Sequence, residues 1–123
     1  MTPVDQTTFG HPGGNCFSAC VASILDLTID DVPYFMDVED WIAKFARWLD
    51  RYDLYPVTFK VGPEWHPAGL YILGGKSSRG DHAVVARARE IVHDPHPSRE
   101  GLIHREDATV LVAYEPKRRG GFT

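Results

Sequence analysis

The sequence has few cysteines, no long apolar run and no excess of positive charge. Only two of its 123 residues are cysteines, Cys16 and Cys20, and their spacing of four means that a disulfide between them would close almost no loop. No apolar run approaches the roughly 20 residues of a membrane-spanning helix. The formal net charge is −4, whereas a surface that binds nucleic acid is usually basic. These absences argue against a disulfide-stapled scaffold, a membrane segment and a nucleic-acid partner.

The N-terminal residues 1–9 also lack the basic and then apolar pattern of a signal peptide. Free thiols suit a reducing compartment, so the expected location is the cytoplasm. The hydrophobic fraction of 43% and the charged fraction of 24% are ordinary for a globular protein. The length predicts one domain over residues 1–115, followed by a loose basic tail over residues 116–123.

Residues 13–25 contain the most informative pattern in the chain, in which two glycines precede a cysteine that begins a helix. Apolar and small residues surround that helix, predicted over residues 15–27, and this is typical of a buried helix. Unpaired N–H groups and the positive end of the helix dipole favour a thiolate at Cys16. Asn15 is the expected N-cap. The alternative is that Cys16 is a small core residue.

The rest of the chain predicts helices first and short strands afterwards, which favours an α+β domain with helices on an antiparallel sheet of about five strands. Thr28 begins a short turn that stops before Pro33, and Asp37 is the expected cap of a second long helix reaching about Tyr52. Residues 74–80 are glycine-rich and predict a loop. The hydrophobic period then predicts strands at 55–61, 70–73, 81–87, 90–93 and 108–114.

His82 and Asp94 are the expected partners of a cysteine nucleophile. A nucleophile needs a base within hydrogen-bond reach and a third group that orients the base. His82 begins an apolar strand and Asp94 ends the next one, so a hairpin with a three-residue loop would bring them together on one face. The Cys16 N–H and the Gln6 side chain are candidate donors to an oxyanion.

The order Gln6, Gly-rich turn, Cys16, His82 and Asp94 resembles that of the papain-like cysteine peptidases. The most similar branch is the compact bacterial one that includes peptidases of double-glycine leader peptides, together with small phage and bacterial proteins. The resemblance implies Cys16 as nucleophile, His82 as general base and acid, Asp94 as orienting residue and Gln6 as oxyanion donor. It implies a peptide or protein substrate and no metal or cofactor. Phe17 departs from the leader-peptidase pattern, which has glycine there, and Gln6 lies farther from the cysteine than in that pattern.

Further residues are candidates for substrate contact. Gly14 and the neighbouring backbone allow close approach of a substrate, and Trp65 lies in a Pro- and Gly-flanked loop that can line a cleft. Residues 98–100 are the expected opposite rim. The candidates are Gly14, Asn15, Phe17, Trp65, Ser78 and Arg79.

Several alternatives remain open at this point. Two cysteines and three histidines have spacings that permit a zinc site, namely Cys16, Cys20, His93, His96 and His104. Asp81 is an alternative to Asp94, and His11 and His66 are alternatives to His82. A papain-like domain that only binds a peptide or protein, and an acyltransferase that uses the same residues, are the alternatives to a hydrolase.

Overall fold

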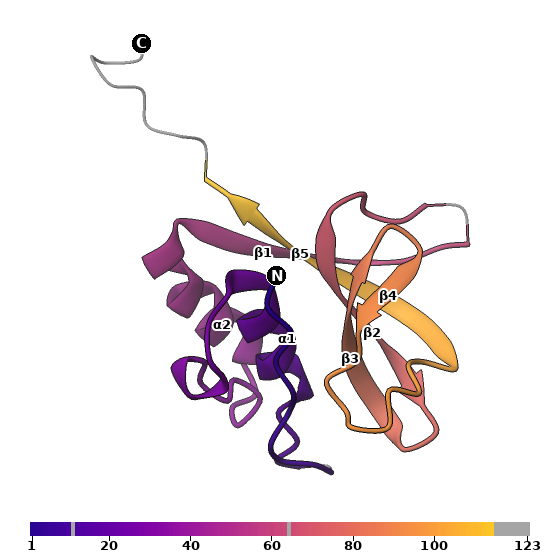
Figure 1. Cartoon of the computed structure of the whole chain (residues 1–123). Helices are drawn as coiled ribbons and strands as arrows, with labels where there is room; N and C mark the ends of the chain where they lie inside the picture. The colour runs from indigo at the N-terminus through magenta and orange to yellow at the C-terminus, as the bar shows by residue number, and fades with distance from the viewer. Residues whose placement is uncertain (11, 64, 115–123) are drawn as a thin grey trace.

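The structure is a computed structural model that describes residues 1–10, 12–63 and 65–114. Two helices, α1 (Cys16–Leu25) and α2 (Trp41–Leu49), lie together on one side of a sheet, as Figure 1 shows. Two short 3-10 turns follow them at Ile29–Asp31 and Asp50–Tyr52. The strands are β1 (Leu54–Lys60), β2 (Leu70–Ser77), β3 (Gly80–Arg87), β4 (Glu90–His93) and β5 (His104–Ala113). The predicted α+β architecture is confirmed, with helices preceding strands.

The five strands form one antiparallel sheet in the order β1-β5-β2-β3-β4. The last strand therefore lies inside the sheet, between β1 and β2. β2 is longer than the predicted strand because β5 pairs with it as far as Lys76. The predicted loop over residues 74–80 is wrong for its first half, and only Ser78 and Arg79 connect β2 to β3.

The helix boundaries differ from the sequence prediction at two caps. The Asn15 side chain makes no capping hydrogen bond to α1. The second helix begins after Asp40, and the Asp37 carboxylate instead accepts a hydrogen bond from Lys44 Nζ at 2.5 Å. Both polar side chains form hydrogen bonds to other parts of the chain instead, and the local spacing that predicts a cap does not reveal these bonds.

The sheet separates two hydrophobic clusters. The larger one lies under the helices and joins α1 and α2 to Ile72, Ala83 and Val85. The smaller one lies on the other face around Tyr71, Leu73 and Val84. In the larger cluster four aromatic rings meet at centroid distances of 4.9–6.4 Å, mostly edge to face. These rings belong to Phe17, Phe35, Trp41 and Phe45.

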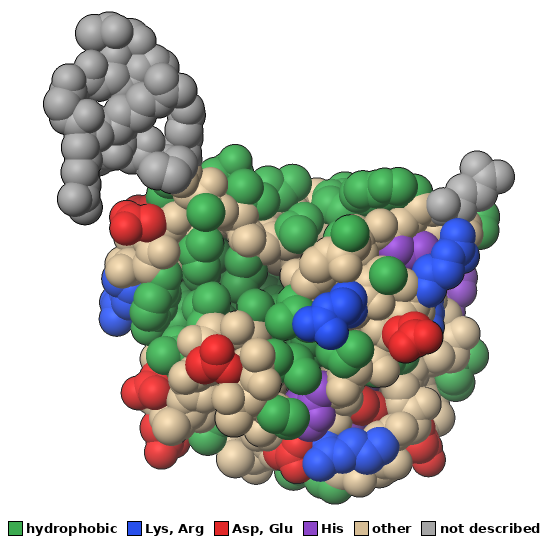
Figure 2. Space-filling view, turned by 45° about the horizontal axis from the view of Figure 1, so that its top comes forward, with side chains coloured by type: hydrophobic (Ala, Val, Ile, Leu, Met, Phe, Trp, Pro, Cys, Tyr) green, Lys and Arg blue, Asp and Glu red, His purple; other side chains and the backbone are tan. Residues whose placement is uncertain are grey.

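The described residues include no helix that is long and apolar enough to cross a membrane. On the face shown in Figure 2, Lys and Arg side chains are interspersed with acidic ones and form no continuous basic surface. The predicted basic tail over residues 116–123 lies outside the described residues.

Replacing Phe45 by alanine is expected to lower the free energy of unfolding by about 3–5 kcal/mol, because a buried ring is replaced by a cavity. Phe45 is only 1% exposed and contacts both Phe17 and Phe35. Urea titration followed by circular dichroism measures this change. The control is Val38→Ala, since Val38 is 45% exposed and its loss is expected to cost under about 0.5 kcal/mol. Equal effects of the two substitutions would contradict the assigned core.

Candidate active site

Cys16 is the first residue of α1 and is partly accessible. The chain before it is held by Asn15, whose Oδ1 accepts hydrogen bonds from the backbone N–H groups of Thr7 and Thr8 at 2.9 and 3.0 Å. Gly14 N donates to Gly10 O at 3.0 Å, and a Cβ on Gly14 would lie 2.6 Å from that oxygen. Asn15 thus positions the loop that leads to the thiol, while the lack of a side chain at Gly14 permits the tight turn.

His82 and Asp94 form a buried pair beside Cys16. His82 Nε2 lies 2.7 Å from Asp94 Oδ1. The same oxygen accepts a hydrogen bond from His96 N at 2.9 Å, and Asp94 Oδ2 accepts one from Gly101 N at 2.7 Å. Because Nε2 faces Asp94, Nδ1 is the ring nitrogen left to exchange a proton with Cys16. The structure therefore brings together the three residues that the sequence predicted.

The hairpin that joins His82 to Asp94 differs from the prediction. Arg87 pairs with Glu90, so the loop has two residues rather than three, and Ala88 adopts a φ of 52° without being glycine. A regular two-residue hairpin would have placed Asp94 on the face opposite His82. The register shifts between Val85 and Ala86, however, and this β-bulge returns Asp94 to the face of His82.

Charge and hydrogen bonding shift both pKa values of the pair. Burial lowers the pKa of His82, but hydrogen bonds to Asp94 and to Cys16 and the charges of both partners outweigh it, raising this pKa to about 9. Burial raises the pKa of Asp94, and the hydrogen bonds from His82 and from two backbone N–H groups overcome this and lower it to about 2. Near neutral pH the pair is therefore an imidazolium and a carboxylate.

Gln6 lies beside the same site and is only 7% exposed. Its backbone N–H donates to Pro95 O at 3.1 Å, and its Nε2 donates to Thr8 O at 3.0 Å. Its Oε1 is buried and has no hydrogen-bond partner among the described residues. Nε2 has a second hydrogen, so one donor of this carboxamide remains for a bound oxyanion.

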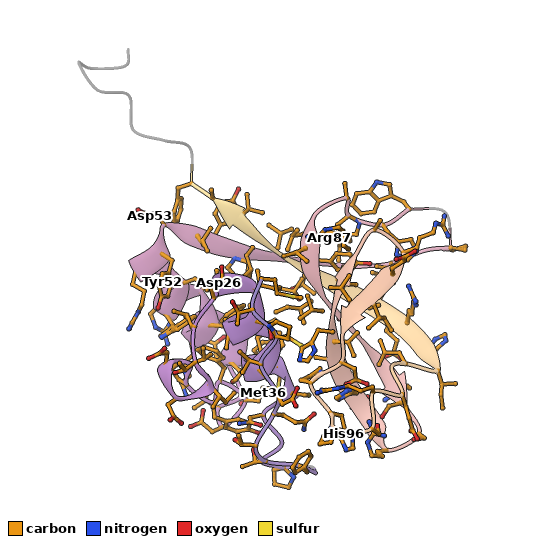
Figure 3. All side chains as sticks on the ribbon, in the orientation of Figure 1. Asp26, Met36, Tyr52, Asp53, Arg87 and His96 are labelled. Atoms are coloured by element: carbon orange, nitrogen blue, oxygen red, sulfur yellow. The ribbon has the colours of Figure 1, made fainter. Side chains whose placement is uncertain are left out.

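Two cavities meet at Cys16, of about 150 and 340 Å³. The smaller is lined by Gln6, Phe9, Gly10, Ser77, Arg79 and His96, besides the residues that both share. The shared residues are Gly14, Cys16, Asp81 and His82. Met36 lines the larger cavity. Figure 3 shows Met36 and His96 at one end of the molecule and Arg87 at the other. The thiol thus lies between two hollows that can hold the two sides of a substrate.

The predicted substrate-contact residues have different outcomes. Gly14 and Arg79 line the smaller cavity. Phe17 lines the larger one, although most of its ring packs in the aromatic core. Ser78 donates to Glu100 at 3.0 Å and Arg79 Nη1 to the same carboxylate at 3.1 Å, which joins this turn to the expected opposite rim.

The placement of Trp65 in the cleft is wrong. Trp65 is 60% exposed, its ring packs against that of Phe59 with centroids 5.1 Å apart, and it lines neither cavity at Cys16. Phe59 packs on the smaller hydrophobic cluster, on the sheet face away from the helices. The Pro- and Gly-flanked loop that suggested a cleft residue instead crosses that far face.

The described residues do not form the alternative sites that the sequence left open. Within the described ranges no group of three or more His, Cys, Asp or Glu side chains is arranged to hold a metal ion. Cys20 is fully buried, and burial raises the pKa of its thiol. His66 contacts Tyr71 and borders a different cavity, Asp81 pairs with Lys76, and His11 lies outside the described residues.

His96 lines the smaller cavity at Cys16, whereas the sequence indicates it only as a candidate zinc ligand. Its ring centroid lies 6.2 Å from that of His82, and its Nδ1 accepts a hydrogen bond from Ser98 N at 3.0 Å. Burial and the charge of Arg79 lower its pKa. Its position two residues after Asp94, in the run His93-Asp94-Pro95-His96, was the available signal.

Comparison with protein-family models, with curated proteins and with solved structures found no significant match to this chain.

Replacing Asp94 by asparagine is expected to destabilise the protein by roughly 2–3 kcal/mol at pH 5–6, since it removes the partner of a buried imidazolium. The raised pKa of His82 stabilises the fold below about pH 6.5, and this stabilisation is lost as pH rises through about 9. The lowered pKa of Asp94 stabilises it above about pH 4, a contribution lost as pH falls through about 2. The difference between wild type and variant should therefore be largest between these limits and shrink above pH 9.

Urea unfolding of both proteins from pH 4 to 10 measures that difference. The matched control is Asp37→Asn, because Asp37 pairs with Lys44 at the surface and its loss is expected to cost under about 1 kcal/mol. A difference between wild type and Asp94→Asn that does not change with pH would contradict the ion pair.

Proposed function

We propose that this protein is a thiol hydrolase of amide bonds with a papain-like arrangement, in which Cys16, His82 and Asp94 act together. The observation that carries the proposal is the 2.7 Å contact between His82 and Asp94 beside a thiol at the start of a buried helix. A structural histidine needs neither a buried carboxylate nor an adjacent accessible thiol. The combination is the one that nucleophilic catalysis requires.

The proposed reaction begins with a thiolate and an imidazolium. Because the pKa of His82 is raised to about 9, its imidazole is the base that accepts the thiol proton. The Cys16 sulfur then attacks the carbonyl carbon of the substrate, an S–C bond forms, and the carbonyl electron pair moves to oxygen. Asp94 stays ionised and holds the imidazole through Nε2, so that Nδ1 faces the reacting atoms.

Two donors are available for the resulting oxyanion. As the first residue of α1, Cys16 has a backbone N–H without an acceptor in the helix. The second is the remaining N–H of the Gln6 carboxamide, in the same cavity. Donors held in place before the reaction stabilise the developing charge without reorganisation.

The intermediate then collapses, the C–N bond breaks, and His82 gives its proton to the leaving amine. This leaves a thioester on Cys16 and a neutral imidazole. His82 next takes a proton from water as the water oxygen attacks the thioester carbonyl, and the C–S bond breaks to release a carboxylic acid and the thiolate. The substrate supported by this chemistry is a peptide or protein amide.

Iodoacetamide is expected to label Cys16 well below pH 8, and to leave Cys20 unlabelled in the folded protein. Mass spectrometry locates the label. Cys20 is an internal control because it is fully buried. His82→Gln should slow the labelling of Cys16 at pH 6 by about tenfold or more, since no imidazolium is left to hold the thiolate. Equal labelling of Cys16 in wild type and His82→Gln would contradict the pair.

Hydrolysis is expected in wild type and absent from Cys16→Ala, with Cys20→Ala as the matched control that keeps activity. A library of peptides incubated with each protein in ¹⁸O-labelled water, and analysed by mass spectrometry, reports new termini and their oxygen. Incorporation of one ¹⁸O per new carboxylate indicates hydrolysis, whereas products extended by an amine indicate acyl transfer. No wild-type product together with an unreactive Cys16 would favour a binding module and overturn the proposal.

A further inference from the structure

The larger cavity at Cys16 has an apolar side, provided by the helical part of the chain. Met36 and Ile42 are 41% and 50% exposed, and Trp41 is partly exposed at the start of α2. Phe17 and Tyr34 complete this side. Exposed apolar side chains beside a nucleophile form a surface that a hydrocarbon chain can cover.

The opposite side of the cavity is acidic. Asp81, Glu106 and Asp107 line it, and no lysine or arginine does so among the described residues. The acidic side chains come from β3 and β5, while the floor contains Gly74 and Gly75 of β2. Two of the acidic residues have a basic neighbour outside the cavity: Lys76 pairs with Asp81, and Lys60 lies opposite Asp107 in the sheet.

Asp107, like Glu106, has a carboxylate that accepts no hydrogen bond from the described residues. The Asp107 carboxylate lies over Gly74, where a Cβ would clash with Asp107 Oδ1. Burial raises the pKa of Asp107, as do the charges of Glu106 and Asp81, and Lys60 offsets only part of this. Because Gly74 has no side chain, the Asp107 carboxylate can lie against the backbone of β2 in the cavity wall.

We infer that the larger cavity binds the long cationic side chain, lysine or arginine, of a residue adjoining the amide that Cys16 attacks. This inference rests on the proposed function and names its substrate class. The aliphatic stem would lie against Met36 and Trp41, and the cationic head would bind the carboxylates of Asp107 and Glu106. Such side chains combine an apolar stem with a charged end, and both halves of the cavity are then used.

The smaller cavity does not fit the same side chain. Arg79 lines it, and His82 and His96 lie on its wall. His82 and Asp81 line both cavities and do not distinguish them, whereas Glu106 and Asp107 line only the larger one. A cation is therefore favoured on one side of Cys16 only, and the substrate has a direction in the cleft.

The first series of the test uses affinity labels, so that it does not depend on amide turnover. Three peptidyl chloromethyl ketones differ only in the residue next to the reactive group: lysine, norleucine or glutamate. Cys16 displaces chloride from each, and mass spectrometry measures the rate of labelling. The lysine reagent is expected to label wild type about tenfold faster than the norleucine reagent, and the glutamate reagent more slowly than both. A second series consists of peptide substrates in which the variable residue lies on the amine side of the cleaved bond. The rate of cleavage of these peptides tests the other substrate direction.

The Asp107→Asn variant is expected to reduce the ratio of the labelling rates for lysine and norleucine from about ten to about one. Asp53→Asn is the matched control, since it removes the same charge at the end of the molecule away from Met36 (Figure 3). Equal rates for lysine and norleucine in both series, with Cys16 still reactive, would overturn the inference and leave the proposed hydrolase intact. A Cys16 that none of the reagents labels would overturn the proposed function itself.

Discussion

The buried carboxylate of Asp94 is the constraint on which the site depends. A charge that is removed from water must be compensated by hydrogen bonds or an opposite charge. Asp94 receives three such bonds, from the His82 ring and from the backbone N–H groups of His96 and Gly101. These donors belong to β3, to the turn after β4 and to the segment before β5. Satisfying one carboxylate therefore brings three separate parts of the chain to the thiol.

The N-terminal segment is tied to the same region. Gln6 N donates to Pro95 O, His93 Nε2 lies 2.9 Å from Val4 O, and Arg99 forms an ion pair with Asp5. These contacts hold the residues before Cys16 against the turn that contains Asp94. The nucleophile, the base and the candidate oxyanion donor are consequently positioned by one network, although they are separated by up to 76 positions between Gln6 and His82.

Much of this arrangement could be predicted from local sequence patterns. Glycines before Cys16 and small residues after it indicate a buried helix that begins at the thiol, and the change of period after Tyr52 indicates strands. The pairing of His82 with Asp94 was predicted from their places on neighbouring strands. The reason given for it was incomplete, because a loop of two residues and a β-bulge, rather than a three-residue loop, set the register. Trp65 was misplaced because flanking prolines and glycines indicate a loop without showing which face of the sheet it crosses.

The sequence by itself determined the elements and their chemistry: a thiol at a helix start, a histidine on one strand and an aspartate directly after the next, and helices before a sheet. These follow from hydrophobic period and backbone preferences, which act over a few residues. Only the tertiary structure decided that Asp94 faces His82, that His96 joins the site, and that Asp107 and Trp41 line the same cavity. Those relations depend on strand order and register: β5, the last strand in the sequence, lies between β1 and β2, and local preferences do not specify such pairing between distant segments.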